Sequence, residues 1–524
     1  MANYLYGAAV QGIQGFIFQT NRLKDIGGAS ELVERICTSL FAELLYENND
    51  NKSGLLERLA SDENAILNAA GNIKYIFTNE EECRRIVASF PKRVMEFAPG
   101  VTISQSVVRI EGNNFHEAVQ NLEANLRTQR NKPMRDLSTG LIGIIRSRET
   151  GLPATHNCNG DYFDSATYHK RYEDEENDEE WRNTPKDTFG KLARKAFGDD
   201  NVTRGNLPEE ISKMTGSNDW IAIIHADGNG LGQVVQKIGS DKRRFKEFSR
   251  KLDEATTEAA VKAARKILDT DTPSTYGKVI PMRPIVLSGD DHTIICRGDL
   301  AIPYTTEFLK AFEETSRNLL ADYINGVFRD GADHLTACAG IVFVKSSFPF
   351  YFGYSLAEAL CDRAKKDSKA LFKAAEGNLP ASALMFHKVQ DSFISDFGEI
   401  VRRELTPQEN ISFEFGPYYL SATSSLPEET LSGRWTIDTL TSKVGELDGE
   451  DGNAVKSGLR QWLSLLHDDP HKAAQRLERL KKVAPTAKRD FISKVTDGRA
   501  ADGTTIYPVY DMLVLHTIDS QVTR

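Results

Sequence analysis

The sequence predicts an α+β protein with two ferredoxin-like (β-α-β-β-α-β) domains and a helical C-terminal domain. Three observations support this fold class: one order of strands and helices occurs twice, a charged segment separates the two copies, and helical periodicity dominates the end of the chain. Two unrelated segments seldom share six elements in the same order by accident, so the repeat carries most weight. The helices of each copy are expected to cover one face of its sheet.

The first copy occupies residues 1–135. Alternating apolar residues predict its strands, and apolar residues three and four positions apart predict its helices. A short turn that contains glycine predicts a hairpin. The expected elements are a strand at 3–10, a helix at 29–46, hairpin strands at 65–69 and 73–77, a helix at 79–96, a strand at 101–110 and a helix at 114–129.

Residues 136–216 are expected to form a charged connector. The run KRYEDEENDEEWRN is mostly acidic and has no apolar period, which is typical of a solvated segment. Pieces that contain glycine and proline flank it. We therefore expect a domain boundary here.

The second copy occupies residues 217–385. Its expected elements are a strand at 220–226, a helix at 241–268, hairpin strands at 284–288 and 292–296, a helix at 304–325, a strand at 335–344 and a helix at 354–373. Residues 386–524 are expected to form a mostly helical domain, since GLRQWLSLL and KAAQRLERLKKV have helical periodicity. A short helix or strand is expected at 506–515.

Composition excludes several classes of protein. The length of 524 residues fits three domains of roughly 150 residues each, and an apolar share of 40% suits folded cores. No run approaches the roughly 18 to 20 apolar residues of a membrane span, so we expect a cytoplasmic protein without a membrane partner. The net charge of -10 argues against a surface devoted to nucleic-acid phosphates. Six cysteines without a C-x-x-C pair encode neither a disulfide framework nor a zinc ribbon.

An acid followed by glycines ends the first strand of the second copy. The strand WIAIIHA runs directly into Asp227, Gly228, Asn229, Gly230, Leu231 and Gly232. The acid offers a metal ligand, and a glycine loop lets the backbone approach phosphate oxygens. A dinucleotide-binding loop would need G-x-G-x-x-G, and a calcium loop would need oxygen ligands where Leu231 and Ile238 stand. A glycine-rich turn with an incidental aspartate is the alternative.

Two adjacent acids, Asp290 and Asp291, stand at the tip of the hairpin in the second copy. Adjacent carboxylates repel each other, so a turn gains nothing from the second acid unless cations neutralise the pair. The inner strand of the hairpin should lie next to the first strand, which places both acids beside Asp227. Three carboxylates suit two Mg²⁺ or Mn²⁺ ions, which can activate an attacking hydroxyl and stabilise a departing pyrophosphate.

Two lysines complete the candidate site. Lys365 and Lys369 are four residues apart on the last helix of the copy, so they share a face, where we expect them to meet a triphosphate. An ordinary solvated helix is the alternative. The candidate catalytic and metal-binding residues are Asp227, Asp290 and Asp291, and the candidate nucleotide-binding residues are Gly228, Asn229, Gly230, Leu231, Gly232, Ser288, Gly289, Lys365 and Lys369.

The first copy lacks these acids. Its first strand leads into Gln11-Gly12-Ile13-Gln14-Gly15, and its hairpin carries Asn72-Ile73 where the second copy has the pair of acids. Without carboxylates it has no ligands for a hard cation. We therefore expect it to have a structural or substrate-shaping role.

These motifs resemble the large polymerase-cyclase subunit of type III CRISPR effector complexes, or a stand-alone relative. That family has two palm domains, and its second palm carries a Gly-Gly-Asp-Asp (GGDD) hairpin, which here reads Ser288-Gly289-Asp290-Asp291 between ADGNGLG and AGIVFVKSSFPFYFGYSLAEALCDRAKKDSK. The stretch VQGIQGFIFQTNRLKDIGGASELV resembles the opening of the family's first palm. The second palm is also similar to GGDEF diguanylate cyclases, in which the lysine of a closing A-L-Y-x-A-K helix binds phosphate. Lys365 in ALCDRAK occupies that place.

The resemblance implies a degenerate first palm and a catalytic second palm that makes oligoadenylate or cyclic (oligo)nucleotide messengers from ATP in antiviral defence. It also implies RNA and other effector subunits as partners. Two departures matter. The connector retains one cysteine where the family often has a zinc ribbon, so no zinc is expected, and cutting of single-stranded DNA by a histidine-aspartate nuclease domain is not expected.

Two other functions stay open. The palms would serve as a scaffold if they bound nucleotide or RNA without turnover, or the chain would be a dinucleotide cyclase that uses GTP. Loss of the acids from one copy and their retention in the other favours chemistry in the second copy. Diguanylate cyclases normally carry a single palm, which favours ATP chemistry.

Overall fold

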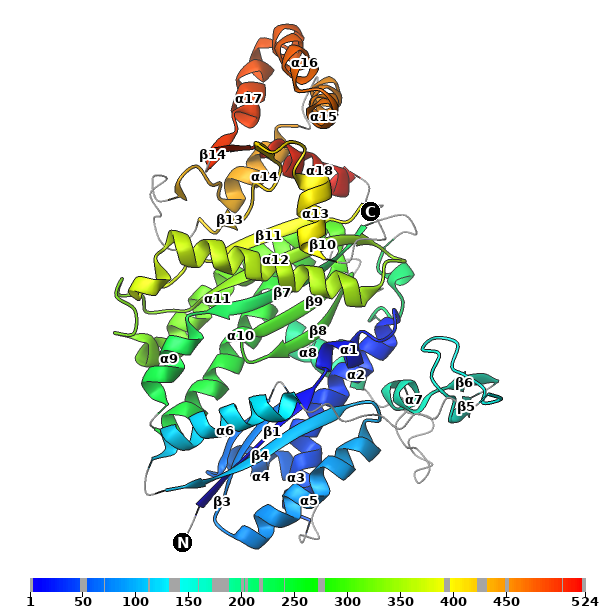
Figure 1. Ribbon diagram of the computed structural model, residues 1–524, viewed down its shortest axis with the longest axis vertical. Coiled ribbons are helices and arrows are strands. Elements are labelled where there is room, and N and C mark those ends of the chain that lie inside the picture. Colours follow the sequence, from blue (N-terminus) through cyan, green and yellow to red (C-terminus); the bar gives the residue numbers. More distant parts are fainter. Residues whose placement is uncertain are drawn as a thin grey trace.

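The computed structural model describes residues 3–47, 54–69, 71–111, 114–131, 142–158, 160–171, 188–198, 202, 206–215, 220–239, 241–271, 279–390, 396–421, 431–447, 452–501 and 503–520. Two β-sheets lie one above the other along the long axis of the molecule, and the helices of the C-terminal region lie at the far end (Figure 1). In the described part of the chain, no helix is both long enough and apolar enough to cross a bilayer.

The sheet of the first copy has the strand order β2-β3-β1-β4, and all neighbours are antiparallel. Its elements are β1 (Asn3–Gln11), α1 (Ile13–Ile17), α2 (Leu23–Arg35), a π-helical turn (Ile36–Leu40), α3 (Phe41–Leu45), α4 (Leu55–Ser61), β2 (Ala65–Ala69), β3 (Asn72–Phe77), α5 (Glu80–Phe97), β4 (Thr102–Ile110) and α6 (Phe115–Arg130). The predicted helix at 29–46 therefore begins earlier, at Leu23, and continues through three segments.

Helices cover both faces of this first sheet, whereas the sequence predicted one covered face. Leu5 and Tyr6 are consecutive on β1, so their side chains point to opposite faces. Tyr6 stacks on Phe41 of α3, and Leu5 belongs to a separate apolar cluster with Leu122 of α6. The additional helix after the fourth strand, α6, thus buries the face that the ferredoxin-like pattern leaves open.

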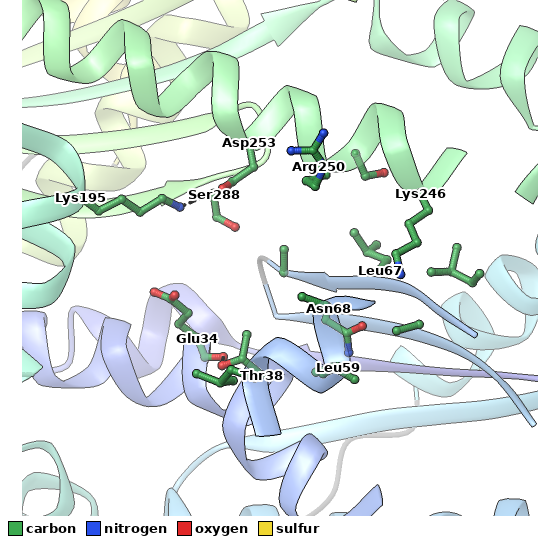
Figure 2. Close-up of a pocket in the computed structure, with 16 residues that line it drawn as sticks. Glu34, Thr38, Leu59, Leu67, Asn68, Lys195, Lys246, Arg250, Asp253 and Ser288 are labelled. Carbon is green, nitrogen blue, oxygen red and sulfur yellow. Dashed lines mark hydrogen bonds and ion pairs between the residues drawn. The ribbon is translucent and has the colours of Figure 1, made fainter. Parts of the chain in front are cut away.

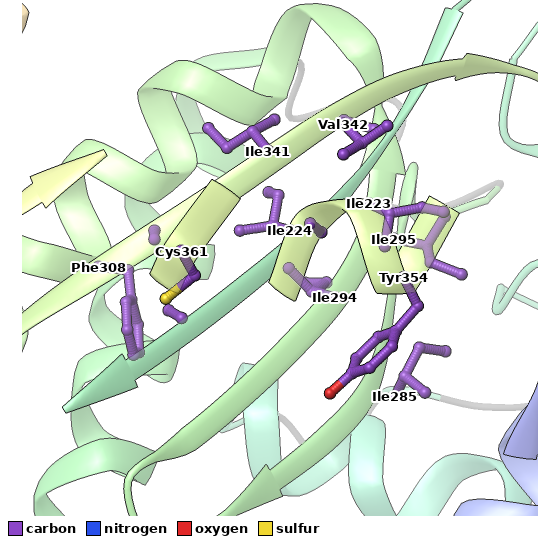
Figure 3. Close-up of a cluster of buried hydrophobic side chains, with 14 of the residues drawn as sticks. Ile223, Ile224, Ile285, Ile294, Ile295, Phe308, Ile341, Val342, Tyr354 and Cys361 are labelled. Atoms are coloured by element: carbon purple, nitrogen blue, oxygen red, sulfur yellow. The ribbon is translucent and has the colours of Figure 1, made fainter. Parts of the chain in front are cut away.

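The sheet of the second copy has the order β13-β11-β10-β7-β9-β8. Its elements are β7 (Trp220–Asn229), α9 (Leu231–Ile238), α10 (Lys242–Asp271), β8 (Met282–Ser288), β9 (Asp291–Arg297), a 3-10 turn (Gly298–Leu300), α11 (Ala301–Ile324), β10 (Thr336–Lys345), α12 (Phe350–Leu371), a 3-10 turn (Ala374–Glu376) and β11 (Ala383–Lys388). Isoleucines from β7, β8 and β9 belong to the core on the two faces of this sheet (Figure 3). A side chain at Gly340 of β10 would put a Cβ 1.9 Å from the carbonyl oxygen of Ala357, so glycine lets α12 pack closely on this strand.

The two copies share one topology. The order β4-β1-β3-β2 of the first sheet recurs as β10-β7-β9-β8 in the second, and β1 and β7 are each antiparallel to both neighbours. The predicted α+β fold class with two ferredoxin-like domains is confirmed. The second sheet extends further than expected, because β11 crosses the predicted domain boundary at residue 385 and pairs in parallel with β10.

The connector contains folded elements that the sequence did not predict. They are β5 (His156–Cys158), β6 (Asp161–Phe163), α7 (Ser165–Arg171), α8 (Thr188–Phe197) and a 3-10 turn (Ile211–Lys213). The main acidic part of the connector lies outside the described residues. The folded parts pack on the copies: α7 contacts α2, and α8 contacts α2, α10 and β8.

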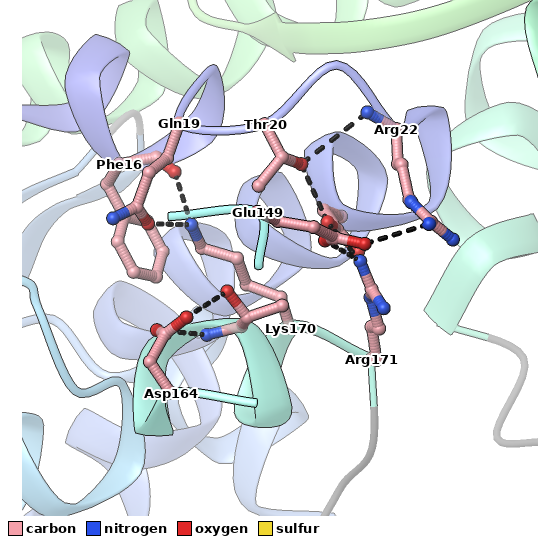
Figure 4. Close-up of polar contacts among 10 residues, drawn as sticks. Phe16, Gln19, Thr20, Arg22, Glu149, Asp164, Lys170 and Arg171 are labelled. Atoms are coloured by element: carbon pink, nitrogen blue, oxygen red, sulfur yellow. Dashed lines mark hydrogen bonds and ion pairs between the residues drawn. The ribbon is translucent and has the colours of Figure 1, made fainter. Parts of the chain in front are cut away.

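Two adjacent basic residues of α7 anchor the connector to the first copy (Figure 4). The Nζ of Lys170 donates to the carbonyl oxygen of Phe16 at 2.7 Å and to Gln19 at 2.8 Å. Arg171 pairs with Asp25 and with Glu149. Because Lys170 and Arg171 are nearly fully buried, this part of the connector is a packed element rather than a solvated linker.

The C-terminal region is mostly helical, as predicted. Its elements are α13 (Phe397–Ile400), a π-helical turn (Val401–Leu405), β12 (Ile411–Ser412), β13 (Tyr418–Tyr419), α14 (Ile437–Gly445), α15 (Gly452–Asp468), α16 (Pro470–Val483), α17 (Thr486–Thr496), β14 (Arg499–Ala501), β15 (Thr504–Ile506) and α18 (Val509–Ser520). The region also adds β13 to the second sheet and forms a small sheet of order β12-β15-β14. The element expected at 506–515 is mainly a helix, α18.

Candidate active site

The three predicted acids meet at one end of the second sheet. Asp227 is the eighth residue of β7 and lies opposite Cys338 of β10. On its other side β7 pairs with β9, where Ala226 lies opposite His292, so the start of β9 brings the hairpin tip to Asp227. The side chains of Asp227 and Asp290 share a hydrogen bond. A Cβ at Gly228 would lie 3.1 Å from the Cβ of Asp290, so glycine permits this close approach.

The three acids lie close enough to shift one another's pKa values, and one lysine, Lys365, acts in the opposite direction. Burial, the hydrogen bond with Asp227 and the charges of Asp227 and Asp291 raise the pKa of Asp290 to about 8. Burial and the charge of Asp227 raise the pKa of Asp291 to about 7, against the opposing effect of Lys365. For Asp227, burial is outweighed by the hydrogen bond with Asp290 and by the charge of Lys365, and its pKa falls below the ordinary value.

Lys365 of α12 pairs with an acid in this structure. Its Nζ forms an ion pair with Asp227 and donates to the carbonyl oxygen of Gly228 at 2.9 Å. Lys369, one turn further along α12, is exposed and forms no hydrogen bond or ion pair with the three acids. The two lysines predicted to act together therefore have different surroundings.

The glycine-rich segment is not a loop. The strand β7 continues through Asp227, Gly228 and Asn229, and α9 begins at Leu231. The side chain of Asn229 is buried and its amide donates to Thr336 at 3.2 Å, on the neighbouring strand. Gly230, with a φ of 81°, joins the strand to the helix, so the segment predicted to cradle phosphate is a strand end and a helix start.

The hairpin tip is held from behind by α10. The backbone N–H of Gly289 donates to Asp253 at 3.2 Å, and its carbonyl oxygen accepts from Thr256 at 2.6 Å. Lys195 of α8 pairs with Asp253 at 3.1 Å and donates to the carbonyl oxygen of Leu287 at the same distance. The connector therefore contributes to the position of the acids.

Two residues that the sequence did not single out reach the site from different copies. Glu358 lies on α12, and its charge contributes to raising the pKa of Asp291. Gln14, at the start of α1 in the first copy, donates to Glu358 at 3.0 Å and to Tyr354 at 3.4 Å. Glu358 was detectable in principle, because it stands seven residues before Lys365, two helical turns along one face. The contact of Gln14 joins residues 344 apart, and no local pattern encodes it.

Two cavities lie between the first and second copies beside the acids. The larger, of about 400 Å³, is lined by Glu34, Thr38, Asn68, Lys195, Lys246, Arg250, Asp253 and Ser288, among others (Figure 2). The smaller, of about 180 Å³, is lined by residues that include Gln14, Glu34, Ser288, Asp291 and Tyr354. Both share Glu34 and Ser288, so the hairpin borders a cleft with walls from both copies.

The donor chemistry of the site fits a hard divalent cation. Three carboxylates with one lysine between them leave negative charge uncompensated, and oxygen ligands are those that Mg²⁺ and Mn²⁺ prefer. As the side chains stand, no set of three acidic, histidine or cysteine side chains among the described residues is arranged to hold an ion. Lys365 supplies the positive charge beside Asp227 instead.

Comparisons with known proteins agree with this architecture. Residues 220–372 match the second palm domain of the Cas10/Cmr2 family. The solved Csm1-Csm4 cassette is similar in its complexes with pppApApA (13% identity, TM-score 0.56) and with cA3 (14% identity, TM-score 0.54), with 99% of this chain and 70% of that chain covered in each. Its complex with one ATP is similar too, at 15% identity and a TM-score of 0.50 over 100% of this chain and 70% of that chain. No curated protein matches the chain.

The family match confirms the resemblance that the motifs predicted. The matched segment contains β7, the acidic hairpin and all of α12, so the candidate site lies wholly inside the segment that matches the Cas10/Cmr2 second palm domain. The TM-scores of 0.50 to 0.56 to the solved structures, at identities of 13 to 15%, show a shared fold and nothing further.

Proposed function

We propose that this chain is a two-metal nucleotidyltransferase of the palm type that joins ATP into oligoadenylate or cyclic oligonucleotide signalling molecules in CRISPR-type antiviral defence. The observation that carries the proposal is the convergence of Asp227, Asp290 and Asp291 at a hairpin tip that borders a cleft between two palms. A structural role would not require buried acids whose charges raise one another's pKa.

The three acids are the proposed ligands of two Mg²⁺ or Mn²⁺ ions. Bound there, such ions would lower the pKa of the attacking ribose hydroxyl and neutralise the triphosphate. Asp227 is held in its charged form by Lys365, whereas Asp290 and Asp291 must release protons near neutral pH before they can act as ligands. Cation affinity should therefore rise with pH.

The cleft between the palms is the proposed substrate site. Its walls carry the cations Lys195, Lys246 and Arg250, whose charge suits triphosphates, and Ser288 stands where the two cavities meet. Lys365, with Lys369 and the backbone of residues 228–232 and 289, is proposed to bind phosphate next to the acids. Gln14 would shape the site from the first palm through Glu358.

The likeness to the Csm1-Csm4 cassette supports adenosine triphosphate as the substrate. That protein was solved with pppApApA, with cA3 and with one ATP, so a related fold holds both a substrate and adenylate products. The same likeness supports assembly of this chain with another effector subunit. An activating RNA is part of this proposal.

A catalytically silent scaffold is the second candidate. The observation that favours it is the ion pair between Lys365 and Asp227, which neutralises one acid without a metal. The two candidates differ in turnover. A cyclase that uses GTP differs from the first candidate only in the base.

The deciding experiment incubates the protein with each of the four labelled ribonucleoside triphosphates and Mg²⁺ or Mn²⁺, then separates the products. ATP should give phosphodiester-linked products and pyrophosphate. Product from GTP alone would favour the dinucleotide cyclase. Nucleotide binding without any product, repeated with the partner subunit and target RNA added, would leave only the scaffold.

A further inference from the structure

A cleft of about 260 Å³ lies at the other end of the second sheet, between the sheet and the C-terminal helices. Trp220 at the start of β7 lies opposite Lys345 at the end of β10, whereas Asp227 lies opposite Cys338. Seven residues of strand separate Trp220 from Asp227, which corresponds to about 23 Å. The cleft is therefore separate from the cleft between the palms.

Basic side chains from the sheet and from α15 gather at this cleft. Lys388 of β11 and Arg460 of α15 line it. Burial lowers the pKa of Lys388, and the charges of Lys345 and Arg460 lower it further. The Nζ atoms of Lys345 and Lys388 lie 4.0 and 5.0 Å from the centre of the Trp220 ring. Two half-buried lysines and the exposed Arg460 thus lie close together.

Neither of the two lining cations is neutralised by a carboxylate in the described chain. Arg460 donates to the hydroxyl of Thr517 at 3.1 Å, and the Nζ of Lys388 lies over the Trp220 ring. The charge of Glu404 acts on Lys388, but the two side chains form no ion pair in the described chain, and Glu404 lies 3.5 Å from His387 instead. Bringing like charges together out of water is unfavourable, so the arrangement favours a bound anion.

The rest of the lining combines aromatic and aliphatic side chains with the polar residues Gln390, Ser464, His467 and Thr517. Phe413 and Tyr510 stack with their ring centres 5.6 Å apart and their planes within 8°, and Gln390 donates to the Tyr510 hydroxyl at 2.9 Å, which fixes the ring. Leu463 and Val514 line the cleft beside them. An inorganic anion would gain nothing from this apolar wall, whereas a nucleobase would.

We propose that this basic cleft binds a nucleoside phosphate, either free or as one residue of a single-stranded RNA, with Lys388 and Arg460 on its phosphate and Tyr510 beside its base. The proposal does not depend on the proposed function. It adds a second nucleotide site about seven strand residues away from the acids. Its test therefore needs no catalytic readout.

The test measures fluorescence anisotropy with two probes, N-methylanthraniloyl-AMP and fluorescein-labelled hexa-adenylate RNA, in EDTA at low salt. K388A/R460A should weaken the Kd of at least one probe tenfold or more, because two phosphate contacts are lost. The matched control is R479A/K482A on the exposed face of α16, which removes the same charge and should stay within twofold of wild type. Weaker binding of the AMP probe by K388A/R460A would identify a free nucleotide as the ligand. Weaker binding of the RNA probe alone would identify a single-stranded RNA as the ligand.

Two further variants keep the test decisive. R460A alone changes an exposed residue and should fold normally, and it should weaken binding about threefold to tenfold. Y510L should weaken binding of the AMP probe, because the base would contact the Tyr510 ring. The concentration of inorganic pyrophosphate that competes with the probe should stay unchanged, because pyrophosphate has no base. Equal binding of both probes to wild type and K388A/R460A would overturn the proposal. So would binding of a labelled poly-glutamate peptide with no binding of either nucleotide probe, which would point to an acidic protein partner.

Discussion

The two palms share one strand order and differ in the polar residues at one end of their central strands. In the second, Asp227 lies near the end of a central strand beside the acidic hairpin, whereas in the first, Gln11 and Asn72 stand at the corresponding strand and hairpin. The first palm instead sends contacts across the interface: Ser30 donates to the carbonyl oxygen of Ile285, and Gln14 donates to Glu358. The same scaffold thus carries a cluster of acids in one copy and contacts to its partner copy in the other, according to a few polar residues near strand ends.

The sharpest way to break this comparison is to remove the acids from the second palm. D290N/D291N should reduce product formation by roughly a thousandfold or more, since loss of the proposed cation ligands removes several kcal/mol of transition-state stabilisation. Rates of product formation from ATP measure the effect. The matched change in the first palm, Asn72→Ala, should leave the rate within about twofold. A fully active D290N/D291N enzyme would disprove the assignment of chemistry to the second palm.

Removing Lys365 separates binding of triphosphate from the charge state of Asp227. Lys365→Met should lower kcat/KM by roughly a hundredfold, because it removes a phosphate contact and a stabilising charge. It should also raise the pKa of Asp227 and of Asp291, because the charge of Lys365 lowers both. Since Asp290 and Asp291 release their protons near neutral pH, a pH-rate profile would show its acidic limb moved to higher pH. Lys369→Met, on the exposed side of the same helix, is the control and should have a much smaller effect.

The contact between the palms predicts an intermediate effect. Gln14→Ala should lower kcat about tenfold by freeing Glu358 and Tyr354, which face the acids. Gly15 is the neighbour of Gln14 on the same short helix. A methyl group there would have no other residue within 4 Å, so Gly15→Ala is a matched control. Steady-state kinetics of both variants give the result. Equal rates for Gln14→Ala and wild type would mean that the first palm does not shape the site.

The smallest effect concerns stability. The pKa values of Asp290 and Asp291 are raised to about 8 and about 7, above the ordinary value near 3.9, so the folded protein binds more protons than the unfolded chain between about pH 4 and pH 8. Their contribution is present at low pH and is lost as pH rises through 7 to 8. In EDTA, D290N/D291N should therefore raise Tm by a few degrees at pH 8.5 and by less at pH 5.5. The lowered pKa of Asp227 acts at lower pH and should not reverse this trend.

Addition of Mg²⁺ extends this measurement. Cations compete with protons for the carboxylates, so Mg²⁺ should raise the Tm of wild type more at pH 8.5 than at pH 5.5. D290N/D291N should lose most of that increase. An equal increase in both proteins would place the ions elsewhere.

Much of the fold followed from local patterns. The strand WIAIIHA and the hairpin strands at 284–288 and 292–296 are mostly apolar, as a buried sheet requires, and the structure places them as neighbours. The helix α9 was missed because its eight residues follow glycines that suggested a loop. Parts of the connector were missed because Lys170 and Arg171, charged in sequence, are buried by partners in the first palm.

The two ferredoxin-like sheets, the acids near the ends of neighbouring strands and the family resemblance were predictable from the amino-acid order, because strand periodicity and turn chemistry are properties of adjacent residues. The pairing of Lys365 with Asp227, the contact of Gln14 with Glu358 and the cleft that Lys388 and Arg460 share became visible with the folded arrangement. These contacts join residues from 72 to 344 positions apart by sequence number. Their partners are chosen by how whole elements pack, and a local pattern of charges holds no information about that choice.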